Sequence, residues 1–152
     1  MITEHASCCC GNIAAKVELS EPISRFTPRA CDCNFCTKHG AAYISDPNGA
    51  LAIQIRNPNE IAKYKHGSGI ADFITCKLCG VFVAVTYSLE GQLLGSLNSR
   101  TLESTSDLAE PQNASPKLLP DADKIGRWEQ IWFQDVTIEN SEALDDKSKF
   151  GV

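Results

Sequence analysis

The chain has 152 residues, a length typical of one domain with its own hydrophobic core, and we expect a single domain over residues 1–152. Its formal net charge is -5, and no run of lysines or arginines could neutralise a row of nucleic-acid phosphates. No stretch approaches the roughly 20 apolar residues of a membrane span, and the first residues lack the features of an export signal. The sequence therefore predicts a cytoplasmic protein with neither nucleic acid nor membrane as a partner.

Short alternating or apolar runs predict β-strands along the chain. Apolar and polar residues alternate over 12–19, which is typical of a half-buried strand, and the β-branched run over 81–87 is typical of a buried one. The expected strands span residues 12–19, 51–56, 81–87, 92–97 and 131–138, the last with a bulge near Gln134 and Asp135. No segment shows a long helical period, so we expect an all-β fold with little helix.

Two segments lack strand patterning. Residues 101–124 are rich in Ser, Asp, Glu and Pro, which predicts a long surface loop with one short helix near residues 106–110. Residues 139–152 are acidic and weakly patterned, which predicts a flexible tail.

The eight cysteines are the most informative residues of the sequence. Without an export signal we expect a reducing compartment, where metal binding is favoured over structural disulfides. Cys76 and Cys79, followed by Gly80, have the spacing of a zinc knuckle, in which both sulfurs reach one ion and the glycine permits a tight turn. Cys8 and Cys10 face the same way on an extended segment and complete a closed, structural zinc site.

The sequence Cys31-x-Cys33-x-x-Cys36 predicts a second site of another kind. Three protein ligands with one open position are the arrangement of a catalytic zinc, so we expect two zinc ions in each chain. Two alternatives remain, a closed site in which one more side chain joins the three cysteines and a disulfide redox pair. The candidates for the closing side chain are Cys9, Asp32, His39 and His66. We otherwise expect Cys9 to be a buried, weakly polar side chain.

The order of the cysteine motifs resembles a known family. Cys-x-Cys-Gly near the start, then Cys-x-Cys-x-x-Cys, then Cys-x-x-Cys-Gly before an apolar strand is similar to the glutathione-dependent formaldehyde-activating enzyme family, which includes centromere protein V. The resemblance spans residues 7–97. It implies a β-tent of antiparallel sheets, a structural zinc on Cys8, Cys10, Cys76 and Cys79, and a catalytic zinc on Cys31, Cys33 and Cys36.

The resemblance also implies an activity, that of a zinc-dependent carbon–sulfur lyase acting on thiol adducts, similar to S-(hydroxymethyl)glutathione synthase. The partners would be a small thiol or aldehyde, with glutathione and formaldehyde as the reference pair, and a homodimer is possible. Another zinc enzyme of the same fold with a different thiol or electrophile, and a non-enzymatic zinc-binding interaction module, are the alternatives.

Several side chains near the second site are candidates for a supporting role. Asp32 and His39 are the titratable groups nearest in sequence for proton transfer, although a solvated position is the usual one for each. An acidic thiol such as glutathione would need cations, for which the candidates are Lys38, Arg100 and Arg127. Trp128 and Trp132 would line a substrate groove or pack in the core.

Overall fold

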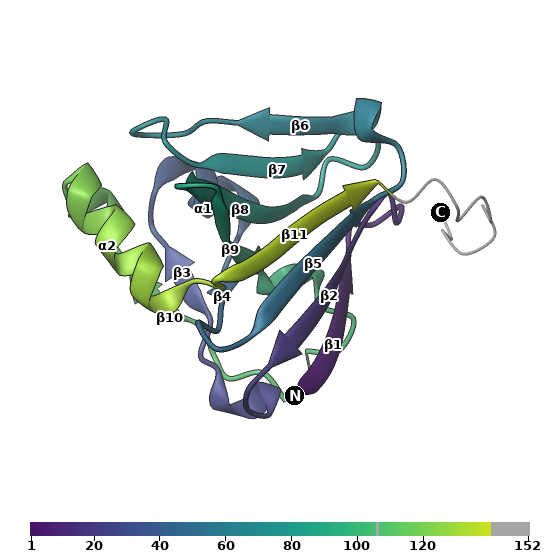
Figure 1. Cartoon of the computed structure of the whole chain (residues 1–152), viewed down its shortest axis with the longest axis horizontal. Helices are drawn as coiled ribbons and strands as arrows, with labels where there is room; N and C mark the ends of the chain where they lie inside the picture. The colour runs from purple at the N-terminus through teal and green to yellow at the C-terminus, as the bar shows by residue number, and fades with distance from the viewer. Residues whose placement is uncertain (106, 141–152) are drawn as a thin grey trace.

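Two β-sheets form the framework of the protein in the computed structural model, which describes residues 1–105 and 107–140 (Figure 1). The first sheet has the order β1 (Ile2–Ser7), β2 (Ile13–Leu19), β5 (Ala50–Ile55) and β11 (Asp135–Asn140). The second has the order β10 (Gln112–Ala114), β3 (Arg29–Cys31), β4 (Tyr43–Ile44), β9 (Gln92–Asn98), β8 (Phe82–Leu89), β7 (Asp72–Cys76) and β6 (Ile61–Tyr64). The expectation of a mainly β fold is confirmed.

Most neighbouring strands are antiparallel, as expected, but each sheet contains one parallel pair. In the first sheet β11 pairs with β5 in parallel, and in the second sheet β10 pairs with β3 in parallel. In both cases a long stretch of chain separates the two partners, which gives the second strand room to enter the sheet from the same end as the first.

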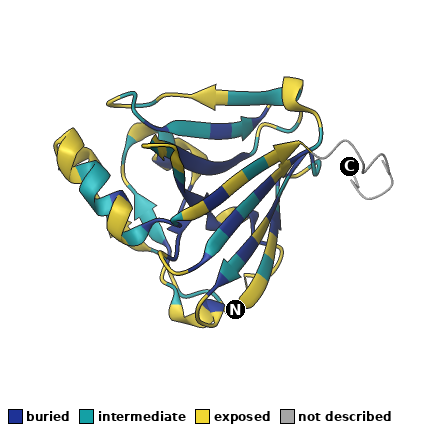
Figure 2. Ribbon diagram, in the orientation of Figure 1, coloured by how far each residue is buried: buried dark blue, intermediate teal, exposed yellow. Residues whose placement is uncertain are grey.

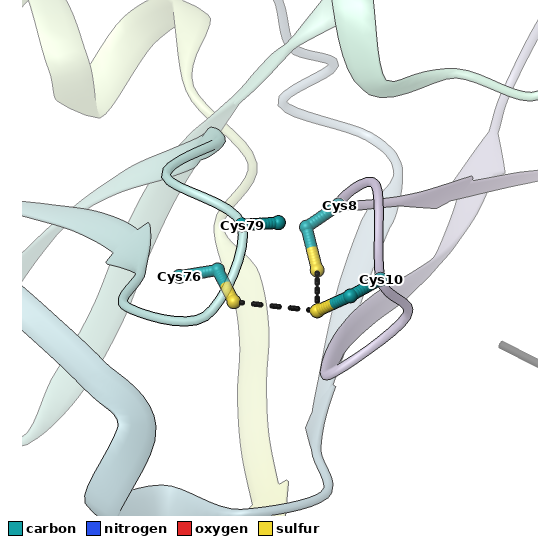
Figure 3. Close-up of side chains that lie close together, drawn as sticks. All are labelled: Cys8, Cys10, Cys76 and Cys79. Carbon is teal, nitrogen blue, oxygen red and sulfur yellow. Dashed lines mark hydrogen bonds between the residues drawn. The ribbon is translucent and has the colours of Figure 1, made fainter. Parts of the chain in front are cut away.

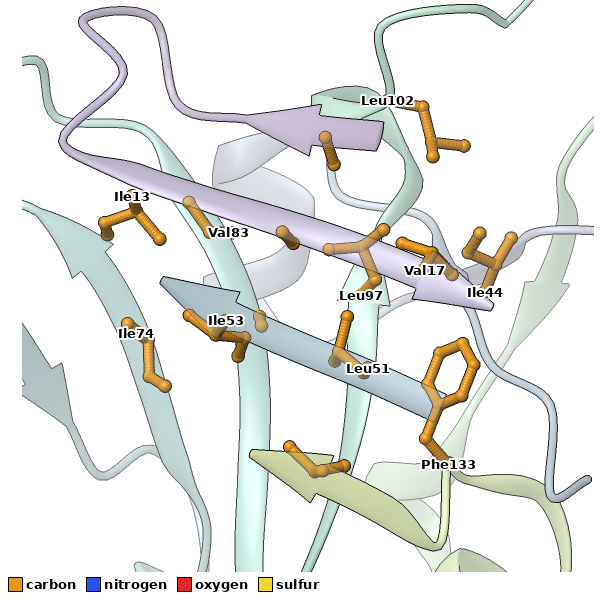
Figure 4. Packing of buried hydrophobic residues seen from close by; sticks show 14 of the residues in the cluster. Ile13, Val17, Ile44, Leu51, Ile53, Ile74, Val83, Leu97, Leu102 and Phe133 are labelled. Carbon is orange, nitrogen blue, oxygen red and sulfur yellow. The ribbon is translucent and has the colours of Figure 1, made fainter. Parts of the chain in front are cut away.

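The hydrophobic core lies between the two sheets (Figures 2 and 4). Ile13, Ala15, Val17 and Leu19 alternate with more exposed residues along β2, as the sequence pattern predicts. They face Ile74, Val83 and Leu97 of the second sheet and Phe133, which lies just before β11. Burying each large apolar side chain stabilises the fold by about 1.5–3 kcal/mol, so this interface fixes the positions of both sheets.

The other face of the second sheet packs against two helices. Helix α1 (Asn34–His39) follows β3, and helix α2 (Asp121–Ile131) precedes β11 at the side of the molecule (Figure 1). A second cluster of buried residues lies here, namely Cys36, Ala41, Tyr43, Ala71, Phe82, Val85, Leu94, Trp128 and Trp132. The second sheet is therefore covered on both faces, which explains why β8 is buried along most of its length.

The prediction for residues 121–138 was partly wrong, because the structure has helix α2 there before strand β11. Residues 121–131 are helical, where we expected the end of a loop and the start of a strand, and β11 begins only at Asp135, with no bulge in its pairing with β5. The apolar residues of the segment, Ile125, Trp128 and Trp132, have helical spacing. Asp121 and Asp123 in the first turn favour the helix because they lie near the positive end of its dipole.

The predicted loop and tail differ from expectation in other ways. The loop contains the 3-10 turns η3 (Ser99–Thr101) and η4 (Pro116–Leu118) and strand β10, and residues 107–110 are not helical. Residue 106, where the short helix was expected to begin, and residues 141–152 of the expected tail lie outside the described residues, whereas residues 139–140 end β11.

Further short elements complete the chain. The 3-10 turns η1 (Ile23–Arg25) and η2 (Pro58–Glu60) connect strands, and the sequence patterns did not predict β1, β3, β4, β6, β7 or β10. None of the helices in the described ranges has the length and apolar character needed to traverse a bilayer.

Candidate metal centres

Four cysteines meet where the ends of the two sheets come together (Figure 3). Cys8 and Cys10 lie in the loop between β1 and β2, Cys76 ends β7, and Cys79 lies in the loop that leads to β8. Their sulfurs all lie within 4.8 Å of one another, at 3.8 Å between Cys8 and Cys10 and 3.6 Å between Cys10 and Cys76. Tetrahedral thiolate ligands of zinc lie about 3.8 Å apart, since each Zn–S bond is about 2.3 Å long. The cluster is thus positioned to bind a metal ion.

Backbone hydrogen bonds fix the conformation of the two loops that carry this four-cysteine cluster. The backbone N–H of Ile13 donates to Cys8 Sγ at 3.3 Å, and the N–H of Gly80 donates to the carbonyl of Cys76 at 2.9 Å. Gly80 has a φ of 76°, so the turn after the knuckle needs glycine there, as predicted. Burial acts against ionisation of Cys79, but hydrogen bonds from the backbone N–H groups of Cys10 and Val81 and from Cys76 and Cys8 outweigh it and lower its pKa to about 6.

The placement of this cluster indicates a structural role. It joins the β1–β2 loop of the first sheet to the β7–β8 loop of the second, and Cys8 and Cys76 are buried in the core between the sheets. Burial raises the pKa of Cys8 to about 12, so in the absence of a positive ion this thiol keeps its proton. A bound metal ion would therefore fasten one end of both sheets, and folding and metal binding would be coupled.

The other three predicted ligands form a second cluster at the start of α1. Cys31 ends β3, Cys33 caps the N-terminus of α1, and Cys36 lies in its first turn with 2% of its surface exposed. The three sulfurs lie within 4.8 Å of one another, and Cys33 Sγ accepts a hydrogen bond from the N–H of Cys36 at 3.4 Å. This triad is positioned to bind a metal ion through three thiolates.

Tyr43 is the closest supporting side chain of the triad. Its hydroxyl lies 2.8 Å from Cys36 Sγ, and the tyrosine is buried on β4. Burial and the neighbouring thiol of Cys36 raise the pKa of Tyr43, so the phenol stays protonated and can donate to sulfur. The hydrogen bond from Cys36 lowers the pKa of Cys31 to about 6 and raises that of Cys36, so Cys31 carries the negative charge of the metal-free triad.

The triad opens into a cavity of about 130 Å³. Among the described residues no histidine, cysteine, aspartate or glutamate joins the three sulfurs as a fourth ligand, although His66 lies on the cavity wall. Phe73, Trp128 and Trp132 form apolar walls, and the two tryptophan rings stack with centroids 4.4 Å apart at 15°. Three ligands beside a small aromatic cavity leave room for a substrate atom at the fourth position.

Basic side chains dominate the charge of this cavity. Four cationic residues line it, whereas none of its lining residues is an aspartate or a glutamate, in a chain whose net charge is -5. These cations are Arg29, Lys117, Lys124 and Arg127. The cavity is therefore suited to a negatively charged molecule.

The structure places several predicted residues away from the cavity. Asp32 is exposed, accepts a hydrogen bond from Ser115 at 2.5 Å and pairs with Lys117 at 3.8 Å. His39 packs against Phe35 on the exposed side of α1, with ring centroids 4.4 Å apart. Neither lines the cavity, which agrees with the solvated positions considered usual for them.

A separate pocket contains the remaining predicted residues. Cys9, Lys38, His39 and Arg100 line it, and the triad does not. Cys9 is exposed, because it points away from the side on which Cys8 and Cys10 meet the knuckle, so the expectation that it is buried was wrong. Of the three predicted cations, Arg127 lies at the cavity, whereas Lys38 and Arg100 do not.

Sequence reasoning missed Tyr43 and Arg29 as site residues. Tyr43 reaches Cys36 only because β4 lies next to β3 in the second sheet, and no local motif marks this pairing. Arg29 could have been noticed, because it lies two residues before Cys31, and side chains two apart in a strand point to the same side.

Comparisons with known proteins give a partial structural alignment and no family. No family model matches the chain, and no curated protein matches it. A crystal structure of a Rhodobacter sphaeroides protein, a structural genomics target, aligns with 22% identity over 71% of this chain and 99% of its own, with a TM-score of 0.49.

Proposed function

We propose that the protein is a zinc-dependent enzyme that joins a small thiol to an aldehyde or releases the two from their adduct. The observation that carries this proposal is the triad of Cys31, Cys33 and Cys36, whose three sulfurs face a cavity with no fourth protein ligand in the described part of the chain. A closed interaction module would have no use for an open ligand position beside a cavity. The order of the cysteine motifs, which resembles the glutathione-dependent formaldehyde-activating enzymes, supports the same class of reaction.

A zinc ion on the triad would supply Lewis acidity to a sulfur or a carbonyl oxygen. The chain's own residues do the rest of the work. Tyr43 donates its hydroxyl to Cys36 and so orients this ligand, as the partners of metal ligands generally do. Phe73, Trp128 and Trp132 exclude water from the reacting atoms, and the cations of the cavity attract an acidic substrate.

The reaction is an addition of a thiol to a carbonyl group. A sulfur–carbon bond forms, the carbonyl π-bond breaks, and the proton of the thiol ends on the former carbonyl oxygen. His66 is the residue that we assign to this proton transfer, because it is half-buried on the cavity wall and an imidazole is the side chain that most often moves protons in enzymes. It replaces Asp32 and His39, which lie outside the cavity.

The size of the cavity favours a substrate other than glutathione on the same scaffold. A cavity of about 130 Å³ is close to the roughly 150 Å³ that accommodates one benzene molecule. Glutathione, a tripeptide, would have to extend most of its length into solvent. A compact thiol or aldehyde fits within the walls, and this is the second candidate for the substrate.

The test is the rate at which purified, zinc-loaded protein accelerates the exchange between formaldehyde, a thiol and their hydroxymethyl adduct, followed by NMR at equilibrium. Glutathione and 2-mercaptoethanol would serve as thiols. We expect acceleration by wild type and by Cys9→Ser, since Cys9 belongs to neither cysteine cluster. We expect none by Cys33→Ser. Equal exchange rates for wild type, Cys33→Ser and a protein-free sample, with each of the two thiols, would contradict the proposal.

A further inference from the structure

We propose that Arg29 and Arg127 together form a carboxylate-binding subsite in the triad cavity, and that the natural substrate is a compact thiol or aldehyde bearing its own carboxylate. The subsite requires only the two arginines, whereas the identity of the substrate rests on the proposed function.

Arg29 lies beside the metal-ligating sulfurs. It precedes Cys31 by two residues on the same strand, so both side chains leave one side of the sheet, and both line the cavity. Two residues of strand span roughly 7 Å. One small molecule can therefore contact the arginine and the triad at the same time.

The guanidinium of Arg29 is held in place by neutral groups. Its Nη2 donates to Ser45 Oγ at 2.7 Å and to Ser96 Oγ at 3.3 Å. Each serine hydroxyl in turn donates its only hydrogen to a backbone carbonyl, that of Ile131 at 2.6 Å and that of Ile44 at 3.1 Å. The serines can thus only accept from Arg29, which fixes the orientation of the guanidinium without neutralising its charge.

Arg127 brings a second positive charge to the same wall. It extends from α2, is half-buried and lines the cavity. In the described part of the chain no carboxylate lies within 4.0 Å of a nitrogen of Arg29 or of Arg127. The two positive charges therefore line one cavity together.

Two like charges in a half-buried position repel one another and lose hydration, and an anion between them relieves both costs. The positive charge of Lys117 needs no such anion, because the carboxylate of Asp32 lies 3.8 Å from its amino group. A guanidinium presents paired N–H groups that match the two oxygens of a carboxylate. The pair of arginines therefore selects a planar carboxylate in a cavity that holds about five to eight non-hydrogen atoms.

The subsite can be tested without the metal-dependent reaction. We would measure binding of propionate and of the uncharged propionamide by saturation-transfer NMR, in wild type, Arg127→Gln, Arg29→Lys and the control Arg25→Gln. Arg25 is exposed and does not line the cavity, so its replacement changes the net charge equally but should not change binding. We expect propionate to bind roughly tenfold or more tightly than propionamide in wild type and Arg25→Gln, because hydrogen bonds to charged groups are the stronger ones.

This preference should disappear in Arg127→Gln and weaken in Arg29→Lys, which keeps a charge but loses the planar group. Circular dichroism would establish that each variant is folded, and Arg127→Gln, at a position outside the two sheets, is the variant to use if Arg29→Lys unfolds. Equal binding of the acid and the amide, or a preference that survives Arg127→Gln, would overturn the subsite.

A second arm separates the subsite from the proposed function. Mercaptoacetate and 2-mercaptoethanol would be compared with propionate on zinc-loaded protein. We expect mercaptoacetate to bind at least tenfold more tightly than either, because it engages both the arginines and the triad. If propionate binds as expected and mercaptoacetate is no better, the subsite stands and the proposed function fails. If both thiols bind equally and propionate does not bind, the subsite fails and the proposed function stands.

Discussion

Replacing Tyr43 with phenylalanine would remove one hydroxyl from the candidate metal centre and leave the rest of the side chain in place. The hydroxyl lies 2.8 Å from Cys36 Sγ, and the ring is 7% exposed. A hydrogen bond to a charged acceptor contributes about 1.5–3 kcal/mol, and Cys36 must be a thiolate in order to bind a metal ion. We therefore expect the zinc affinity of the triad to fall roughly tenfold to a hundredfold, the usual effect of losing a partner of a ligand.

The assay is a competition titration of zinc-loaded Tyr43→Phe against a chelator of known affinity, with urea denaturation as a second measurement. Because the ring still packs, the free energy of unfolding measured without zinc should stay within about 1 kcal/mol of the wild-type value under the same conditions. Tyr64→Phe is the control, since Tyr64 is 49% exposed and its ring contacts are with Phe35 and His66. Equal zinc affinity of the triad in Tyr43→Phe and wild type would refute the assignment of Tyr43 as a supporting group.

Three other changes test separate parts of the structure. Phe133→Ala, at a side chain with 0% exposure, should cost about 3–5 kcal/mol in urea denaturation, and a cost below about 1 kcal/mol would contradict its place in the core. In metal-free protein, alkylation of Cys31 by iodoacetamide should stay fast as the pH falls from 9 and slow only near pH 6, because the lowered pKa keeps this side chain a thiolate. Mass spectrometry would locate the label. A rate that is already halved near the ordinary pKa of 9.0 would contradict this prediction. Removal of metal by a chelator should lower the melting temperature of wild type by more than that of Cys10→Ser, since this variant has already lost a ligand of the four-cysteine cluster. Equal decreases in the two proteins would contradict a structural role for this cluster.

The two cysteine clusters could be predicted from sequence because the spacing of cysteines restricts the local geometry. Cys76 and Cys79 bracket a turn, and Cys31, Cys33 and Cys36 span the end of a strand and the first turn of a helix. Such short segments have few conformations, so spacing alone places the sulfurs. The pairing of Cys8 and Cys10 with the distant knuckle required only that two ligands be missing from one site and present elsewhere.

The rest of the candidate site depends on contacts between strands that are distant in sequence. Tyr43 reaches the triad through the pairing of β3 with β4, and Arg127 reaches the cavity because α2 packs on the second sheet. Neither contact has a local pattern. Trp128 and Trp132 show the limit clearly, because a spacing of four was taken for part of a strand although it is also the spacing of one helical face.

The strands, too, could be predicted only where the sequence pattern is local. The strands with strict alternation or a long β-branched run, such as β2 and β8, were predicted from sequence. The short strands β3, β4 and β10, of two or three residues, have too few positions for a period to be visible, and their neighbours in the sheet define them.

We propose that the chain has two separate metal centres, one closed and one open. The most direct measurement is the zinc content of wild type, Cys33→Ser and the control Cys9→Ser, each purified without added zinc and shown to be folded. We expect close to two zinc ions per chain in wild type and Cys9→Ser and close to one in Cys33→Ser, because only the triad loses a ligand. About one zinc ion in all three proteins would contradict the account, since Cys31, Cys33 and Cys36 would then bind no metal.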